Sequence, residues 1–266
     1  MISIISINRK FLPLPAKDLI NKIAASRFTR GLEISCDPNE EAMMNYMDEL
    51  VEGCKENNLL FQVHGDSSLD MDTQKKFLDL LTRYSDYLGY PINVVMHTLT
   101  RETKEESLHD SQEYFGELLE YIDTDKIRLS IENLNDDIKF MRLDKDEMLP
   151  IFYNDNRLYM TYDIGHEIAD YGQITNIDEE EVKRISNVHI HSIDPTWDDG
   201  WDHKPIDDEN DEFGPVLKGI LFLKHIKYDG PVVFEYDSYL CKGDNMSEKT
   251  DDYIASIDDT SEHFIQ

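Results

Sequence analysis

Eight short runs of β-branched and other apolar residues recur along this 266-residue chain, and longer amphipathic segments separate them. The runs predict strands at Ile2–Ile7, Gly31–Ser35, Leu59–His64, Ile92–His97, Ile127–Glu132, Leu158–Asp163, Ser186–His191 and Pro231–Glu235. Apolar residues recur at spacings of three and four in the helical segments, most clearly at Lys17–Ser26, Glu41–Asn57, Thr73–Tyr87, Glu106–Ile122 and Pro215–His225. Such alternation of strands and helices is typical of a parallel sheet with helical crossovers.

Eight strands in a chain of this length favour an α/β fold of the (β/α)8 TIM barrel type over a doubly wound sheet. No G-x-G-x-x-G motif follows the first strand, which weakens a dinucleotide-binding interpretation. No internal repeat, linker or change of composition divides the chain. Residues 1–266 are therefore predicted to form a single domain.

The charge of the chain disfavours several classes of partner. Its 56 acidic residues against 26 Lys and Arg give a formal net charge of −30. A protein that grips nucleic acid needs clustered basic residues, and an acidic membrane surface would be repelled. Three scattered cysteines, Cys36, Cys54 and Cys241, are too few for a disulfide framework, so a reducing cytoplasm is expected.

Six of the predicted strands end, at or near their C-terminal tips, in a residue able to bind a metal ion. They read F-Q-V-H at His64, V-V-M-H at His97, L-S-I-E at Glu132, M-T-Y-D at Asp163, N-V-H-I-H at His189 and His191, and V-V-F-E at Glu235. In a barrel these tips meet at one mouth, and buried like charges are costly without a cation. The pattern therefore predicts a divalent metal site, although the sequence does not choose among Mn, Zn, Co and Mg.

Taken singly, each of these residues has an ordinary structural explanation. A lone His64 or His97 is more often a satisfied core histidine, and Glu132 alone could cap or pair across the barrel. His191 follows His189 by two residues, so both point to the same strand face. We expect one of this pair to be a ligand and the other to touch substrate.

The segment from Asp194 to Glu212 carries nine acids and both tryptophans of the chain. It follows the seventh strand and is predicted to be a long loop. Such a loop is either a solvated surface segment or a lid, with Trp197 and Trp201 as substrate-stacking surfaces.

The order of these motifs resembles the xylose-isomerase-like TIM barrel superfamily, which contains sugar isomerases and epimerases and the metal-dependent apurinic endonucleases. The resemblance runs from G-L-E-I-S at Gly31 through I-E-N at Ile131, D-I-G-H at Asp163 and V-H-I-H at Val188 to G-P-V-V-F-E at Gly230. It implies a shared metal set of Glu132, Asp163, His189 and Glu235, and further histidines of multinuclear sites at His64, His97 and His166. It also places Glu33, in the second strand, near the substrate.

The sequence departs from the endonucleases after strand seven. They carry an Asp-x-His pair there that holds a further metal, whereas this loop reads G-W-D-H-K-P. Asp202 is adjacent to His203, and Trp201 occupies the Asp position. His203 is thus left as an additional ligand candidate, and a third metal is disfavoured.

The sequence favours a metal-dependent isomerase or epimerase acting on a small polyhydroxylated carbonyl compound. The metal would stabilise a developing enediolate, Glu132 and Glu235 would act as acid and base, and His166 would bind substrate oxygens. A dehydratase begins with the same proton abstraction. The expected partner is a small sugar-like molecule, without nucleic acid or membrane, and the sequence is compatible with a homo-oligomer.

Two further alternatives stay open. The first is a phosphodiesterase of the apurinic-endonuclease type, which the near-complete ligand set favours and the net charge opposes. The second is a catalytically silent binding protein. Basic residues are sparse near the strand ends, and Arg101 and Lys204 are the nearest candidates for a phosphate site.

Overall fold

The computed structural model describes residues 1–8, 14–35, 38–134, 142–175, 177–192, 203, 215–236 and 245–265. Its strands are β1 (Ile2–Asn8), β2 (Thr29–Ser35), β3 (Leu60–His64), β4 (Ile92–His97), β5 (Ile127–Glu132), β6 (Tyr159–Asp163), β7 (Ile185–Ile190) and β8 (Pro231–Phe234). Its helices include α1 (Ala16–Ala25), α2 (Glu41–Asn57), α3 (Met71–Leu88), α4 (Lys104–Tyr121), α5 (Lys145–Asn154), α6 (Ile164–Tyr171), α7 (Glu179–Arg184), α9 (Pro215–His225) and α11 (Met246–Ile265).

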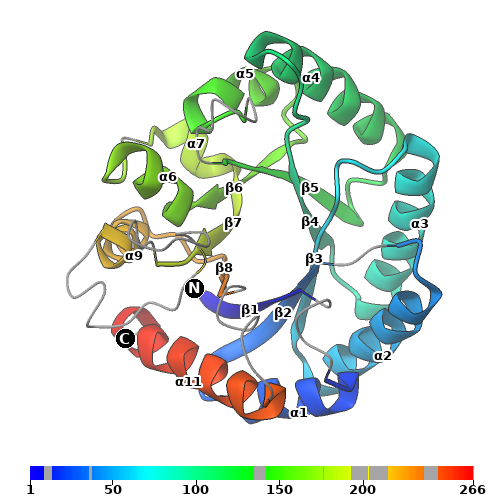
Figure 1. The fold of residues 1–266 in the computed structure, drawn as a ribbon, viewed down its shortest axis with the longest axis vertical. Helices are drawn as coiled ribbons and strands as arrows, with labels where there is room; N and C mark the ends of the chain where they lie inside the picture. The colour runs from blue at the N-terminus through cyan, green and yellow to red at the C-terminus, as the bar shows by residue number, and fades with distance from the viewer. Residues whose placement is uncertain are drawn as a thin grey trace.

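The eight strands form one closed barrel. Each strand pairs in parallel with the next one along the chain, and β8 pairs with β1. The helices form a ring around the barrel, with α11 lying beside α1 (Figure 1). The predicted (β/α)8 barrel is therefore confirmed. Among the described residues, no helix combines the length and apolar character needed to cross a lipid bilayer.

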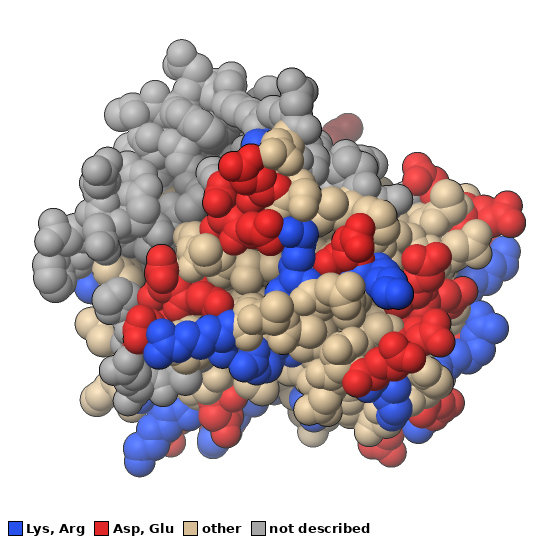
Figure 2. All heavy atoms as spheres, turned by 90° about the horizontal axis from the view of Figure 1, so that it is seen from below, with Lys and Arg blue, Asp and Glu red and all other residues tan. Residues whose placement is uncertain are grey.

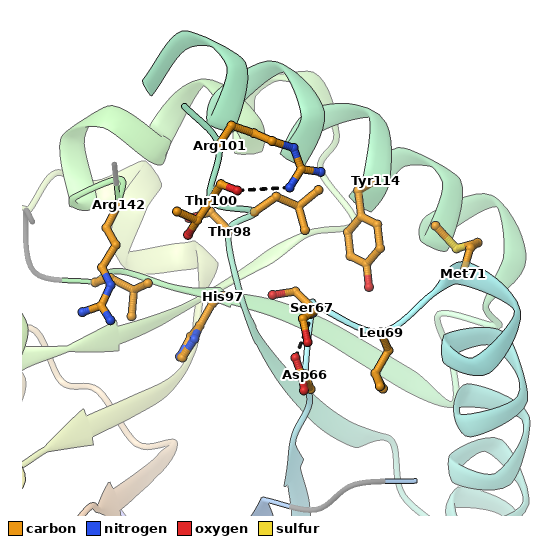
Figure 3. Close-up of a pocket in the computed structure, with 13 residues that line it drawn as sticks. Asp66, Ser67, Leu69, Met71, His97, Thr98, Thr100, Arg101, Tyr114 and Arg142 are labelled. Carbon is orange, nitrogen blue, oxygen red and sulfur yellow. Dashed lines mark hydrogen bonds between the residues drawn. The ribbon is translucent and has the colours of Figure 1, made fainter. Parts of the chain in front are cut away.

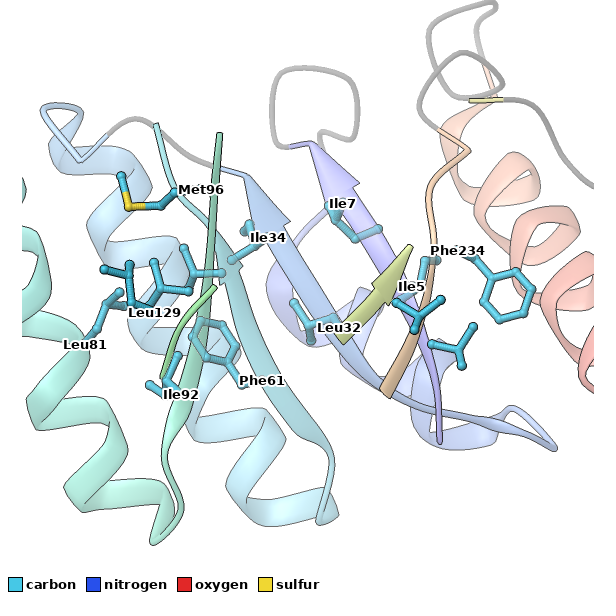
Figure 4. Close-up of a cluster of buried hydrophobic side chains, with 14 of the residues drawn as sticks. Ile5, Ile7, Leu32, Ile34, Phe61, Leu81, Ile92, Met96, Leu129 and Phe234 are labelled. Carbon is cyan, nitrogen blue, oxygen red and sulfur yellow. The ribbon is translucent and has the colours of Figure 1, made fainter. Parts of the chain in front are cut away.

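Alternation along the strands divides the side chains into two sets. Residues such as Leu32, Phe61 and Leu129 are buried in the hydrophobic core between the barrel and the helices (Figure 4). Their neighbours in sequence point into the barrel, where Asn187 of β7 reaches Glu33 of β2, 3.3 Å away. Strands β2 and β7 are not paired, so this contact crosses the barrel interior. The period-two pattern thus carries polar side chains inside the barrel.

Short side-chain caps fix where several helices begin. Asp70 accepts a hydrogen bond from the backbone N–H of Thr73 at the start of α3. Capping boxes start α4, α5 and α7. The sequence analysis did not predict α5, α6, α7 or α11. Helix α5 contains Pro150, and α6 follows β6 directly because Asp163 is also its N-cap residue.

Helix α11 forms hydrogen bonds at the start of β2 and at the end of β8. The carboxylate of Asp258 accepts hydrogen bonds from Ser26 Oγ at 2.6 Å and from the backbone N–H of Phe28 at 2.9 Å, just before β2. Tyr253 donates its hydroxyl to the carbonyl of Phe234 at 2.5 Å, at the end of β8. These bonds hold two strand ends that position site residues.

Candidate metal centre

Glu132 lies at the centre of the site, at the C-terminal end of β5, and its side chain is 1% exposed. Its Oε2 is 3.0 Å from Nε2 of His64 and 3.1 Å from Nε2 of His97. Its Oε1 is 3.1 Å from Nδ1 of His189. These partners come from β3, β4 and β7, so one carboxylate joins ligand candidates from three other strands.

The first ligand set is the one that the resemblance implied. Ligand atoms of Glu132, Asp163, His189 and Glu235 all lie within 4.8 Å of one another, and all four residues are buried. Strand register contributes to this, because Asp163 pairs with His189 across β6 and β7. One oxygen of Asp163, Oδ2, is buried without a hydrogen-bond partner among the described residues. Three buried carboxylates with one imidazole fit a divalent cation.

The second set consists of His64, His97 and Glu132, whose ligand atoms also lie within 4.8 Å of one another. His64 places Nδ1 3.2 Å from the carbonyl oxygen of Gly65, so Nδ1 carries a proton. Its Nε2 then faces the Glu132 carboxylate. Without a cation or a second proton on the ring, this contact would join two lone pairs. The second set therefore also fits a cation.

A third set brings His166, His191 and His203 within the same 4.8 Å limit. The rings of His191 and His203 stack with centroids 4.4 Å apart. Nδ1 of His191 accepts a hydrogen bond of 3.0 Å from the backbone N–H of His203, so the neutral ring carries its proton on Nε2. Because an ion at Nε2 would displace that proton, this set fits a metal less well than the other two do. That agrees with the loop sequence, which disfavours a third metal.

The buried carboxylates and histidines of the site shift one another's pKa values. Burial would lower the pKa of His64, but the hydrogen bond and charge of Glu132 outweigh it and raise this pKa to about 9. Burial also opposes protonation of His189, yet the carboxylates of Glu235, Glu33 and Glu132 hold its pKa well above the usual value. The same pairings keep the pKa values of Glu132 and Glu235 well below normal despite burial. Protons on the two histidines thus stand where a cation would neutralise the carboxylates.

Glu33 is fully buried on β2, on the far side of His189 from Glu132. Its carboxylate is 3.3 Å from Nε2 of His189 and accepts a 2.6 Å hydrogen bond from Gln62. Glu33 and His189 form the carboxylate–histidine pair that often supports a metal ligand. The contact of Glu33 with substrate stays a prediction.

Two residues in the first turn of α6 support the first set. His166 donates its backbone N–H to Oδ1 of Asp163 at 2.7 Å, and its Nδ1 lies 2.9 Å from the carbonyl oxygen of Asn133. A Cβ at Gly165 would overlap the ring of His191, which explains the glycine of the D-I-G-H motif. The D-I-G-H motif thus ends β6 and begins α6.

Sequence reasoning missed the role of Asn133. Its Nδ2 donates to the carbonyl oxygen of Asp163 at 2.9 Å, and its Oδ1 accepts from the Asp163 N–H at 2.8 Å. This two-bond clamp fixes the backbone of a ligand candidate. The I-E-N motif contained the signal, since an amide following a ligand at a strand end can bridge to the next strand.

Of the remaining predicted site residues, the structure describes His191 and His203. His191 is fully buried 3.3 Å from Asp163, and its contact with substrate stays a prediction. Nε2 of His203 is 3.3 Å from Oε2 of Glu235. Trp197, Trp201 and Lys204 lie outside the described residues, and so does most of the acidic loop.

Comparison with known proteins places the chain in a family. The model of the xylose isomerase-like TIM barrel family matches residues 25–258. No curated protein matches the sequence.

Three solved structures share the fold. D-psicose 3-epimerase with D-tagatose from Clostridium cellulolyticum H10 is 16% identical, with a TM-score of 0.65, over 98% of this chain and 99% of that one. The IolI protein with a bound zinc atom is 15% identical, with a TM-score of 0.66, over 98% of each chain. The apo 3-keto-D-glucoside 4-epimerase YcjR from E. coli is 15% identical, with a TM-score of 0.59, over 97% of this chain and 99% of that one. Together with the family match over most of its length, these findings mean that this chain belongs to the xylose isomerase-like TIM barrel family.

Proposed function

We propose that this protein is a divalent-metal-dependent isomerase or epimerase of a small sugar or related polyhydroxylated carbonyl compound. The observation that carries the proposal is the pair of buried carboxylates Glu132 and Glu235. Both contact Nδ1 of His189, at 3.1 and 3.3 Å, yet Glu132 ends β5 and Glu235 directly follows β8, and these two strands are not paired. Two sugar epimerases among the similar structures support the proposal.

Two facing carboxylates suit a proton transfer at a carbon next to a carbonyl group. One carboxylate removes the proton, and the electron pair of the C–H bond moves toward the carbonyl oxygen. The other group, in its protonated form, returns a proton to the opposite face, which inverts that carbon. Return of the proton to the neighbouring carbon instead gives an isomer.

The residues that would hold the ion are Glu132, Asp163, His189 and Glu235, with His64 and His97 beside them. A bound divalent ion supplies Lewis acidity that stabilises negative charge on the substrate oxygens. His166 is fixed through Nδ1 by the Asn133 carbonyl, so its Nε2 carries the lone pair with which it would accept a substrate hydroxyl. Trp197 and Trp201 would cover the sugar from the acidic loop.

Exchange of substrate hydrogen with solvent tests the proposal directly. Protein loaded with Mn or Zn is incubated in D2O with a panel of ketoses and ketose phosphates, and loss of the C–H signal is followed by proton NMR. We expect exchange on at least one sugar. Glu132→Gln and Glu235→Gln should each lower its rate by at least about 100-fold, since acid–base groups typically contribute that much. Glu52→Gln, at an exposed position of α2, is the matched control.

Elemental analysis of the same samples reports bound metal separately. Exchange that survives both substitutions at full metal occupancy would refute the assignment of the two carboxylates. Elimination of water from the substrate, detected in the same spectra, would identify the chemistry as that of a dehydratase.

The main alternative is a metal-dependent phosphodiesterase of the apurinic-endonuclease type. Adjacent ligand sets that share Glu132 favour it, because phosphoester chemistry often uses paired ions. The net charge of −30 opposes it. On the face drawn in Figure 2, Lys and Arg side chains are interspersed with Asp and Glu side chains. Metal-dependent incision of an abasic-site duplex at low salt, with no exchange on any sugar, would favour this alternative.

A further inference from the structure

A cavity of about 580 Å³ adjoins the metal centre without including its four-residue ligand set. Its walls come from the loop after β3, the loop after β4, helix α4 and the chain after β5 (Figure 3). His97 is the residue shared with the metal centre. Its Nε2 is 3.1 Å from Glu132, and its side chain is 40% exposed. A compound that reacts beside Glu132 can therefore extend past His97 into this cavity.

The lining carries many hydrogen-bonding groups. It includes Asp66, Ser67, Thr98, Arg101, Tyr114 and Arg142, beside a smaller number of aliphatic side chains. A lining that combines donors and acceptors with apolar surface suits a sugar, whose hydroxyl groups form hydrogen bonds while its C–H faces contact apolar side chains. The volume lies within the range of about 300–1,000 Å³ that is typical of small-molecule sites.

The charged groups of the cavity balance one another. Arg101 donates from Nε to Asp110 at 2.5 Å and from one terminal nitrogen to the Thr100 carbonyl at 3.1 Å. This pairing neutralises and orients its guanidinium. Asp66 and Arg142 add one charge of each sign to the lining. Balanced charge on a strongly acidic chain favours a neutral ligand over a phosphate or carboxylate.

Tyr114 supplies a second, independent observation. Its hydroxyl oxygen is buried and has no hydrogen-bond partner among the described residues. Figure 3 shows this hydroxyl directed toward the loop that carries Asp66 and Ser67. A buried hydroxyl without a partner costs about 1–3 kcal/mol, so a ligand that bonds to it gains affinity.

We propose that this cavity is a binding subsite for a neutral, hydroxyl-rich substituent of the substrate, such as a second sugar ring attached to the reacting sugar. The substrate is then a glycoside or disaccharide, and the metal centre takes only its reacting end. The assignment of the ligand as substrate rests on the proposed function. Tyr114 and Ser67 contact the second ring, and His97 marks the boundary between the two parts.

The first experiment measures binding and does not depend on turnover. Saturation-transfer NMR with the metal-loaded protein compares lactulose and isomaltulose with fructose, their matched monosaccharide. We expect at least one disaccharide to bind at least tenfold more tightly than fructose. Ser67→Phe, which fills the cavity from a loop, should remove that difference, and Tyr114→Phe should weaken disaccharide binding severalfold. Ser247→Phe, at an exposed position of α11, is the matched control.

A second experiment repeats the solvent-exchange assay with the same sugars and variants. We expect Ser67→Phe to slow exchange on the disaccharide much more than exchange on fructose. If no sugar exchanges, the proposed reaction fails, but disaccharide binding that is lost in Ser67→Phe still supports the subsite. Equal binding of fructose and both disaccharides by the wild-type protein would overturn the subsite. So would tighter binding of fructose 6-phosphate that is lost in Arg142→Gln. If Ser67→Phe does not fold, Tyr114→Phe decides between these outcomes.

Discussion

Replacement of Glu33 by glutamine should weaken metal binding although Glu33 is not among the predicted metal ligands. His189 faces Glu132 and Glu235 through Nδ1, so the metal would bind at that nitrogen. Its other nitrogen, Nε2, lies 3.3 Å from the Glu33 carboxylate. Nε2 also lies 3.0 Å from Nδ2 of Asn187, and the carboxylate is the group there that favours a proton on Nε2. That proton leaves the Nδ1 lone pair for the ion, and the carboxylate makes the ring a stronger donor.

The size of the effect follows from the loss of that charge alone. Glutamine keeps the shape of the side chain and can still accept the 2.6 Å hydrogen bond from Gln62. Supporting partners of this kind typically contribute a factor of about 10–100 in metal affinity, equivalent to about 1.4–2.7 kcal/mol. We therefore expect the dissociation constant for Zn or Mn to rise by one to two orders of magnitude in Glu33→Gln.

Competition with a chromogenic chelator measures this constant without reference to activity. Glu52→Gln controls for the change of charge at an exposed position. A direct contact between Glu33 and substrate predicts a different result, namely a raised KM with unchanged metal affinity. A dissociation constant within about twofold of the wild type, in a variant with wild-type circular dichroism, would refute the supporting role.

Two further predictions concern the metal-free protein. Because the pKa of His64 is raised to about 9 from an ordinary value of about 6.5, its proton stabilises the folded state by about 3 kcal/mol below pH 6, and this stability is lost as the pH rises through 9. Thermal unfolding of chelator-treated protein should therefore show a Tm that falls between pH 6.5 and 9. An unchanged Tm in the wild type, or an equal fall in His64→Gln, would show that the proton on His64 is not the cause. Asn133→Ala removes both bonds to the Asp163 backbone and should lower the free energy of unfolding by about 1–3 kcal/mol in urea titrations, together with metal affinity. A variant of wild-type stability that binds metal normally would show that the clamp is dispensable.

The strands and the convergence of their polar C-terminal residues could be predicted from the sequence, because both depend on one short-range rule. The residues of a strand alternate between two faces, so an apolar run that ends in a polar residue predicts both the strand and the direction of that residue. The predicted bounds Ile92–His97 and Ile127–Glu132 match β4 and β5 without change. Parallel order then brings all such strand ends to one mouth.

The apolar periodicity alone did not predict several helices, because a shared cap residue or an internal proline obscures it. Asp163 ends β6 and also caps α6, so no connecting residues separate the strand from the helix. Pro150 interrupts the pattern of α5, although the Asp144–Glu147 capping box still starts it. Such caps are visible in the sequence and mark the start of these helices more clearly than the spacing of apolar residues does.

The contact between Glu33 and His189 could be found only from the closed barrel. Its strand, β2, lies far in sequence from β7, and the hydrogen bond from Asn187 to Glu33 joins residues 154 positions apart. Only closure of the sheet brings the two strands face to face across the interior. The sequence shows which residues point inward, but it does not show which inward residues meet.

The inward residues form two connected layers, and this arrangement links metal binding to folding. Glu33 and Gln62 lie beneath His189, while Glu132 and Glu235 lie on its other side. His189 therefore contacts both layers. The layer of Glu33 and Gln62 is held by a direct hydrogen bond, whereas the layer of Glu132 and Glu235 requires a positive charge to offset its two carboxylates. In the metal-free protein that charge is a proton, and raising the pH removes it. A bound metal ion would take over the same role, so we expect its affinity to rise with pH over the range in which the metal-free protein loses stability.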